Sequence, residues 1–147
     1  MRPLILAIAL SLASCSQTPV MAQSAISEVV LQTIAMESAN QSALGQQLVA
    51  HVIINRAVVS HKSLVAICKQ PKQFSCWNSP SKAKAWLDRH YTPKARQNAR
   101  NALETAFKTR AYPAIRHYHA KSVRPYWAKG HKPTVVWGDH LFYGGIK

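Results

Sequence analysis

The chain is poor in carboxylates, which restricts where acid chemistry can occur. Its 147 residues include 19 lysines and arginines but only five acids, Glu28, Glu37, Asp88, Glu104 and Asp139. Glu37 follows Val30 and Ile34 at helical spacing, on an otherwise apolar face of a predicted helix. Burial and the negative end of the helix dipole both disfavour the ionised form of a carboxyl there, as a general acid requires. The alternative interpretation is a glutamate at a frayed helix end that points to water or pairs with an arginine.

The elements that position Glu37 are predicted to be mainly helical. Apolar periodicity indicates a first helix over residues 24–38, and the small polar residues of 40–45 predict a turn. The next helix ends before His61 and is expected to be largely buried because of Leu48, Val49, Val52, Ile53 and Val59. Asn55 lies at an apolar position of that helix, and we expect it to bind a backbone group within the core.

The rest of the chain predicts shorter helices and then strands. A short helical turn at 63–69, an aromatic loop at 70–80 and helices over 81–90 and from Thr92 to about Arg110 are expected. From residue 111 the composition changes, and the segments 115–119 and 134–145 predict strands, the second folding back at Gly138 and Asp139. The fold class is therefore α+β, with a small antiparallel element last.

Several short blocks occur in a distinctive order along the chain. Glu37 is followed by Gly45-Gln46, then by VIINR at 52–56, QPKQFSCW at 70–77, HYH at 117–119, Pro125 with Trp127-Ala128, and WGDHLFY at 137–143. This ordered set resembles the cell wall hydrolase family typified by the spore-cortex-lytic enzymes (SleB/CwlJ-type). The resemblance covers about residues 30–143, and the set is far more specific than any one block.

The resemblance implies a fold, a substrate and a catalytic acid. It implies a lysozyme-like, mainly helical domain that cuts glycan strands between N-acetylmuramic acid and N-acetylglucosamine. In that family the first glutamate of a GEARGE-like segment is the acid, and the segment Met36–Gln41 occupies this place. Glu37 is therefore the expected acid, while Met36 replaces the glycine and Gln41 replaces the second glutamate.

A single acid favours one of the two routes for cleaving a glycosidic bond. Ordinary hydrolysis uses two carboxyl groups that flank the bond. Among the other four acids only Asp139 falls in a matching block, where a turn is predicted. A lytic transglycosylase needs one residue, which first protonates the glycosidic oxygen and then acts as a base. We therefore predict a lytic transglycosylase that needs no cofactor.

The matching blocks also provide candidates around the acid. Tyr118 falls where such sites place a tyrosine beside the acid, although it could instead be a core aromatic of a strand. The expected substrate-binding residues carry amide, hydroxyl, imidazole or indole groups: Gln41, Gln73, Ser75, Trp77, His119, Trp127 and His140. The aromatic members, and Phe74 beside them, could equally pack in the core.

A metal site is a further alternative, and no metal ligand is assigned. His117 and His119 alternate to one face of a strand, and His140 could supply a third ligand. No carboxylate is placed to complete the set. This pattern would suit a metal-dependent hydrolase.

The first 22 residues resemble an export signal. Arg2 precedes the apolar run 4–13, and residues 20–22 (VMA) suit signal cleavage. The run is too short to anchor the chain across a membrane. LASC at 12–15 resembles a lipobox, which would lipidate Cys15 and hold the protein at a membrane. We expect an exported protein of the periplasm or cell envelope, with residues 23–147 as the catalytic domain.

The other two cysteines are consistent with export. Cys68 and Cys76 are an even pair, and disulfides persist outside the cytoplasm. A disulfide and two free buried thiols both remain open at this point. Zinc binding is disfavoured because the pair lacks the close spacing of zinc ligands.

The net charge indicates an anionic partner. The formal charge is +14, which would attract polyanions. Outside the cytoplasm these are peptidoglycan carboxylates and other anionic envelope polymers, and nucleic acid is not expected. We predict a monomer that acts on peptidoglycan. A non-catalytic, basic envelope-binding module is the alternative in a different functional class.

Overall fold

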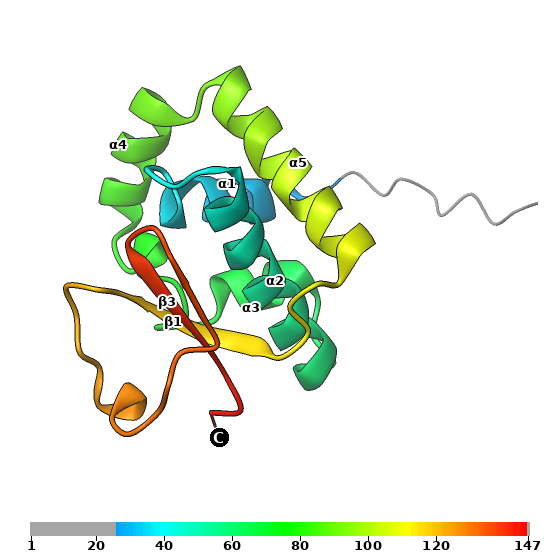
Figure 1. Ribbon diagram of the computed structural model, residues 1–147. Coiled ribbons are helices and arrows are strands. Elements are labelled where there is room, and N and C mark those ends of the chain that lie inside the picture. Colours follow the sequence, from blue (N-terminus) through cyan, green and yellow to red (C-terminus); the bar gives the residue numbers. More distant parts are fainter. Residues whose placement is uncertain (1–25, 147) are drawn as a thin grey trace, which may run out of the picture.

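The computed structural model describes residues 26–146, so the predicted signal 1–22 and Cys15 lie outside the described residues. The elements follow one another as α1 (Glu28–Glu37), α2 (Ala43–Ser60), α3 (Leu64–Lys69), η1 (Ser75–Trp77), α4 (Pro80–His90), α5 (Pro93–Thr109), β1 (Ile115–Ala120), η2 (Tyr126–Ala128), β2 (Val135–Trp137) and β3 (His140–Gly144) (Figure 1). Helices come first and a small antiparallel sheet comes last, which confirms the predicted α+β class. Within residues 26–146, no helix has the length and apolarity needed to cross a membrane.

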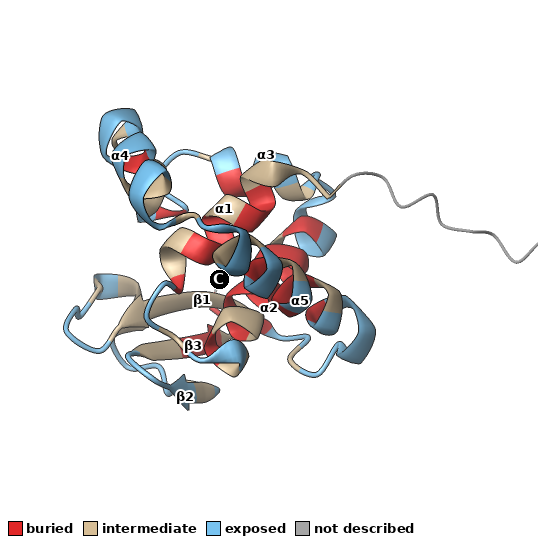
Figure 2. Cartoon of the chain, turned by 90° about the horizontal axis from the view of Figure 1, so that it is seen from above, coloured by how far each residue is buried: buried red, intermediate tan, exposed pale blue. Residues whose placement is uncertain are grey.

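The helix α2 lies at the centre of the core. Its buried residues include Leu48, Val49, Val52 and Ile53, and the middle of its ribbon is red in Figure 2. Helix α5 presents Ala99, Ala102 and Ala106 to the core, all buried. Small side chains there allow the backbones of packed helices to approach closely.

The second helix ends before His61 as predicted, but its start and the burial of its last turn differ from the prediction. It begins at Ala43 rather than near Leu48, so the turn after α1 is shorter than predicted. Gly45 belongs to the helix, where a Cβ atom would meet the side chain of Gln41 at 2.6 Å. The glycine therefore permits a close approach and does not form a turn. Val59 was predicted to be buried but is 58% exposed, because the core ends near Ala57, one turn before the helix does.

Side chains also fix the helix boundaries and the entry to the sheet. Thr92 caps α5 by accepting a hydrogen bond from the Ala95 backbone N–H, with 3.2 Å between N and Oγ1. The Asn55 amide donates to the carbonyl oxygens of Tyr112 and Ile115 at 2.7 and 2.8 Å. This confirms the predicted role of Asn55 and ties α2 to the start of β1.

The three strands form a sheet in the order β1-β3-β2, with all pairs antiparallel. Tyr118 pairs with Phe142 and Ala120 pairs with His140, so Tyr118, His140 and Phe142 lie on one face. That face contacts the helices, since Phe142 is in the core. His119, paired with Leu141, and Tyr143 lie on the other face. The fold-back at Gly138 and Asp139 occurs as predicted, with Gly138 at φ +52°.

Candidate active site

Glu37 is the last residue of α1 and faces a cleft. The cleft has a volume of about 530 Å³, and its lining includes Met36, Glu37, Ser75, Cys76, Trp86 and His140. One carboxylate oxygen, Oε1, accepts hydrogen bonds from the backbone N–H of Cys76 at 2.9 Å and from the Ser75 hydroxyl at 3.4 Å. Glu37 is the sole carboxylate that lines this cleft within residues 26–146.

Tyr118 holds the second oxygen of the same carboxyl group. Its hydroxyl donates to Oε2 of Glu37 at 2.6 Å, from the middle of β1. The ring stacks on Phe142, with centroids 5.5 Å apart, and meets the ring of His140 edge-on. Burial and the neighbouring Glu37 carboxylate raise the pKa of Tyr118 well above its ordinary value. The hydroxyl therefore stays protonated and acts as a donor.

The three hydrogen bonds to Glu37 come from two separate parts of the chain, η1 and β1. A carboxylate has about four lone-pair sites, and Cys76, Ser75 and Tyr118 take three of them. One site is left for a proton or for a substrate atom. Because the donors belong to η1 and β1, the carboxyl group connects the end of α1 to the sheet.

The guanidinium group of Arg56 lies near Glu37 and Tyr118. Arg56 of α2 donates from Nε to the Arg116 carbonyl oxygen at 2.6 Å and lies over the Phe74 ring, 5.2 Å from its centroid. Burial lowers the pKa of Arg56, and the nearby Tyr118 and Glu37 oppose this effect. Arg56 thus places positive charge near the Glu37 carboxylate. Sequence reasoning did not assign it a role, although its position at the end of the VIINR block was an available signal.

Cys68 and Cys76 are free in the structure, so the free-thiol alternative holds and the disulfide is absent. Burial raises the pKa of the Cys68 thiol to about 11. The pKa of the Cys76 thiol is also raised, first by burial and then by the Glu37 carboxylate. Both thiols therefore remain protonated, and Cys76 serves the site through its backbone N–H.

Three of the predicted substrate-binding residues divide between the cleft and its surroundings. Ser75 lies in the cleft beside Glu37. Gln73 is exposed in the loop before η1 and does not line the cleft. Trp77 donates from Nε1 to the Thr33 hydroxyl at 2.9 Å and packs against the core. Its ring lines a neighbouring hollow together with Leu87 and Tyr91 instead of the Glu37 cleft.

His140 lines the cleft from the sheet. It packs against Tyr118 and Phe142, with ring centroids 5.2 and 5.9 Å away. Burial lowers the pKa of His140, while Glu37 and Asp139 act in the opposite direction. Its Nδ1 atom is buried without a hydrogen-bond partner among the described residues.

Gln41 was expected to bind substrate, but it does not line the Glu37 cleft and instead joins two turns. Its amide nitrogen donates to the Asp139 carboxylate at 3.5 Å, and its Oε1 accepts from the Asp139 backbone N–H at 3.4 Å. A Cβ atom at Gly138 would fall on this same Oε1 atom. Trp137 adds a bond from Nε1 to the Ser42 hydroxyl at 2.8 Å. The side chain at position 41 thus holds the β2–β3 turn against the α1–α2 turn.

His119 and Trp127 are not brought together with Glu37. His119 lies on the face of the sheet opposite to Tyr118, and Trp127 packs edge-on against it, with ring centroids 5.5 Å apart. His117 and His119 share that face, whereas His140 lies on the other. The three histidines therefore do not converge, and no group of three potential metal ligands is found within residues 26–146. The metal-site alternative has no geometric basis.

The structure adds residues that sequence reasoning missed. Helix α4 contributes Lys82 and Trp86 to the lining of the Glu37 cleft, and the preceding loop contributes Asn78 and Ser79. Trp86 lies near His90, with ring centroids 5.2 Å apart. Periodicity predicted the helix, and an indole on a short, otherwise polar helix was the one available signal for a binding role.

Comparisons with known proteins identify a family and a fold. A family model described as cell wall hydrolase matches residues 40–143. The crystal structure of the catalytic domain of the Bacillus cereus SleB protein matches with a TM-score of 0.56 and 18% sequence identity, covering 78% of this chain and 85% of that one. No curated protein sequence matches the chain. The structural likeness extends to the fold, which is the expected mainly helical, lysozyme-like domain with a small C-terminal sheet.

Proposed function

The chain belongs to the cell wall hydrolase family, and on that premise we propose that it cleaves peptidoglycan glycan strands as a lytic transglycosylase. The bond cut is the one between N-acetylmuramic acid and N-acetylglucosamine, and Glu37 acts first as acid and then as base. One observation carries the proposal: Glu37 lies in a cleft, held by Cys76 and Tyr118, and no other carboxylate lines that cleft within the described residues.

The first step needs a protonated carboxyl group. Glu37 gives its proton to the glycosidic oxygen while the bond from that oxygen to C1 of N-acetylmuramic acid breaks. The departing N-acetylglucosamine keeps the oxygen as a hydroxyl group. The Cys76 N–H and the Tyr118 hydroxyl then face the carboxylate that forms, and such charge-assisted bonds are stronger than neutral ones.

The second step uses the same group as a base. The Glu37 carboxylate takes the proton of the C6 hydroxyl of N-acetylmuramic acid, and the C6 oxygen bonds to C1. The product is a 1,6-anhydro ring, and Glu37 is again protonated for the next cut. Ordinary hydrolysis would need a second carboxyl group at about 5 to 9.5 Å from the first across the bond, and the cleft lining provides none within residues 26–146.

Other cleft residues suit an amino sugar substrate. Trp86 offers an aromatic face to a sugar ring, and Asn78 and Ser79 offer hydrogen-bonding groups. Lys82 adds a positive charge at the same wall, which suits a substrate that carries carboxylates. Cleavage of peptidoglycan also accords with the proposed export signal in residues 1–22.

Analysis of the products tests the proposed route. Purified sacculi digested with the protein should release muropeptides that end in 1,6-anhydro-N-acetylmuramic acid, which mass spectrometry distinguishes by the loss of one water. Reducing N-acetylmuramic acid ends would show that water attacks C1, and would overturn the transglycosylase route. The absence of any released muropeptide would instead favour the non-catalytic binding module.

A further inference from the structure

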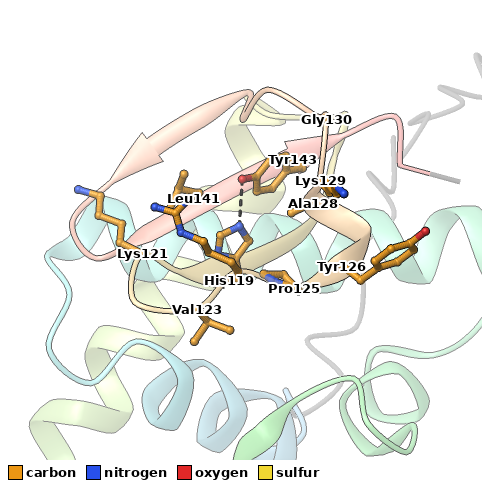
Figure 3. Close-up of a pocket in the computed structure, with 11 residues that line it drawn as sticks. His119, Lys121, Val123, Pro125, Tyr126, Ala128, Lys129, Gly130, Leu141 and Tyr143 are labelled. Atoms are coloured by element: carbon orange, nitrogen blue, oxygen red, sulfur yellow. Dashed lines mark hydrogen bonds between the residues drawn. The ribbon is translucent and has the colours of Figure 1, made fainter.

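A second groove lies on the face of the sheet that points away from the helices. It has a volume of about 870 Å³, within the range of pockets that hold small ligands. Its floor comes from β1 and β3, with His119, Leu141 and Tyr143, and its wall comes from the segment 121–130, with Val123, Pro125 and Ala128 (Figure 3). The groove is therefore bounded mostly by apolar and aromatic groups.

Hydrogen bonds and ring contacts hold the floor in place. The two ring nitrogens of His119 bind the Ala120 carbonyl oxygen at 2.8 Å and the Tyr143 hydroxyl at 2.9 Å. The His119 and Tyr143 rings stack with centroids 5.4 Å apart, and Trp127 meets both of them edge-on. Figure 3 shows the His119 ring directed at the Tyr143 hydroxyl. The floor is thus ordered before any ligand arrives, which reduces the entropy cost of binding.

The rim of the groove is positively charged. Lys121, Arg124 and Lys129 line it, and no aspartate or glutamate does within residues 26–146. Their side chains are exposed, and the ion pairs of the described residues involve other cations. Three unpaired cations around an apolar floor are complementary to a ligand that carries both carboxylates and aliphatic groups.

The groove is separate from the cleft of Glu37. Tyr118 projects from β1 toward Glu37, whereas its neighbour His119 projects into the groove from the opposite face. A ligand in the groove therefore cannot be the sugar pair that is cut at Glu37 at the same moment. It can still be another part of the same polymer.

We propose that this groove binds the acidic stem peptide of peptidoglycan. The carboxylates of a stem peptide match the three cations, and its alanine methyl groups and aliphatic side chains match the apolar floor and wall. A polymer of phosphate and glycerol has charges for the rim but little apolar surface for the floor. The identity of the polymer rests on the proposed function. A second contact of this kind keeps the protein on the wall between cuts, because it raises the local concentration of the next strand.

Binding of the free stem tetrapeptide tests the groove directly. The dissociation constant, measured by calorimetry, should rise about fivefold or more in a variant with Lys121→Gln, Arg124→Gln and Lys129→Gln, since each exposed charge pair contributes modestly. The matched control replaces Lys94, Lys108 and Arg110, which are exposed cations of α5 and its C-terminus, and should bind as tightly as wild type. Equal weakening in both variants would overturn the proposal, because net charge alone would then explain binding.

The apolar wall gives an independent variant. Val123 is 52% exposed, so Val123→Ser should leave the fold intact. It should nevertheless weaken binding of the tetrapeptide by about two- to fivefold, because the variant lacks the methyl groups that the bound peptide would cover. Unchanged binding in Val123→Ser, at unchanged thermal stability, would contradict the assignment of the apolar groove.

Sedimentation with insoluble wall material distinguishes the possible sources of the ligand. The experiment uses a Glu37→Gln background so that retention is measured without cleavage of the sacculi. Intact sacculi should retain the protein, and sacculi whose stem peptides have been removed by an amidase should retain less. Equal retention by the stripped sacculi, or stronger binding of polyglycerol phosphate than of the tetrapeptide, would overturn the proposal. If Glu37→Gln loses activity while the tetrapeptide and sedimentation tests show no binding in the groove, the proposed function stands and the groove proposal is overturned.

Discussion

At the scale of single residues, the site depends on a carboxyl group that three donors surround. Glu37 was singled out by its place on an apolar helix face and by the resemblance to the cell wall hydrolase family, and Tyr118 by that resemblance alone. The resemblance placed the tyrosine beside the acid, and the structure shows this contact as a hydrogen bond of 2.6 Å. Arg56 and Trp86 were missed because an arginine at the end of a buried helix and a tryptophan in a polar helix have several ordinary explanations.

Replacement of Tyr118 by phenylalanine tests the contact with Glu37. The ring should keep its stacking on Phe142, but the hydrogen bond to the carboxyl is lost. A bond to a charged group contributes about 1.5 to 3 kcal/mol, so kcat/KM on sacculi should fall by about 10- to 100-fold. The control is Tyr112→Phe, at a half-buried tyrosine whose ring packs edge-on against His51, and it should retain activity. Full activity in Tyr118→Phe would remove the tyrosine from the mechanism.

At the scale of elements, the turn between β2 and β3 is held by the turn between α1 and α2. The fold-back at Gly138 and Asp139 was predicted, and so was the single face shared by His117 and His119. The period of a strand determines which residues share a face, but it does not determine which face the helices cover. For this reason His119 and Trp127 were expected near Glu37 and lie on the far side of the sheet. The contact of Gln41 with Asp139 could not be predicted either, because the two residues lie far apart in the sequence.

A pair of glycine substitutions measures the contact between the turns. Gly138→Ala introduces a side chain at φ +52° and onto the Gln41 amide, whereas Gly130→Ala introduces one at φ +81° with nothing within 4 Å. Both variants incur backbone strain of about 1 to 2 kcal/mol. Only Gly138→Ala should also displace Gln41, so its melting temperature and its activity should fall below those of Gly130→Ala. If the two variants behave alike, Gln41 does not hold this turn.

At the scale of the whole molecule, the chain combines an excess of cations with histidines that are buried, as His51 is, or half-buried, as His117 and His140 are. The net charge of +14 was evident from the sequence, and it favoured an anionic partner without locating the surface that binds it. The pKa values of His51, His117 and His140 are all lowered, in each case chiefly by burial. Composition alone could not show this, because it does not distinguish buried from exposed histidines.

The buried histidines predict how stability depends on pH. Their pKa values lie below the unfolded value near 6.5, so the unfolded chain binds more protons as the pH falls. The free energy of unfolding, measured with urea, should therefore be highest above pH 6.5 and decline toward pH 5. The slope per group cannot exceed about 1.4 kcal/mol per pH unit, the limit for one proton. His51→Gln should reduce the decline, and a flat profile for wild type would contradict the lowered pKa values.

The central claim is that Glu37 supplies the proton for cleavage. The most direct test is the rate at which the Glu37→Gln variant cleaves the glycan strands of purified sacculi. Glutamine keeps the shape of the side chain but has no proton to give, so turnover should fall by about 10² to 10⁴. Folding should not suffer, since removing a partly buried carboxyl relieves a desolvation cost. The matched control is Glu28→Gln at the start of the same helix, where the carboxylate binds Tyr91 at 2.6 Å and Arg96 at 3.0 Å; it should lower stability and leave turnover near that of wild type. Near-normal turnover by a folded Glu37→Gln protein would contradict the account.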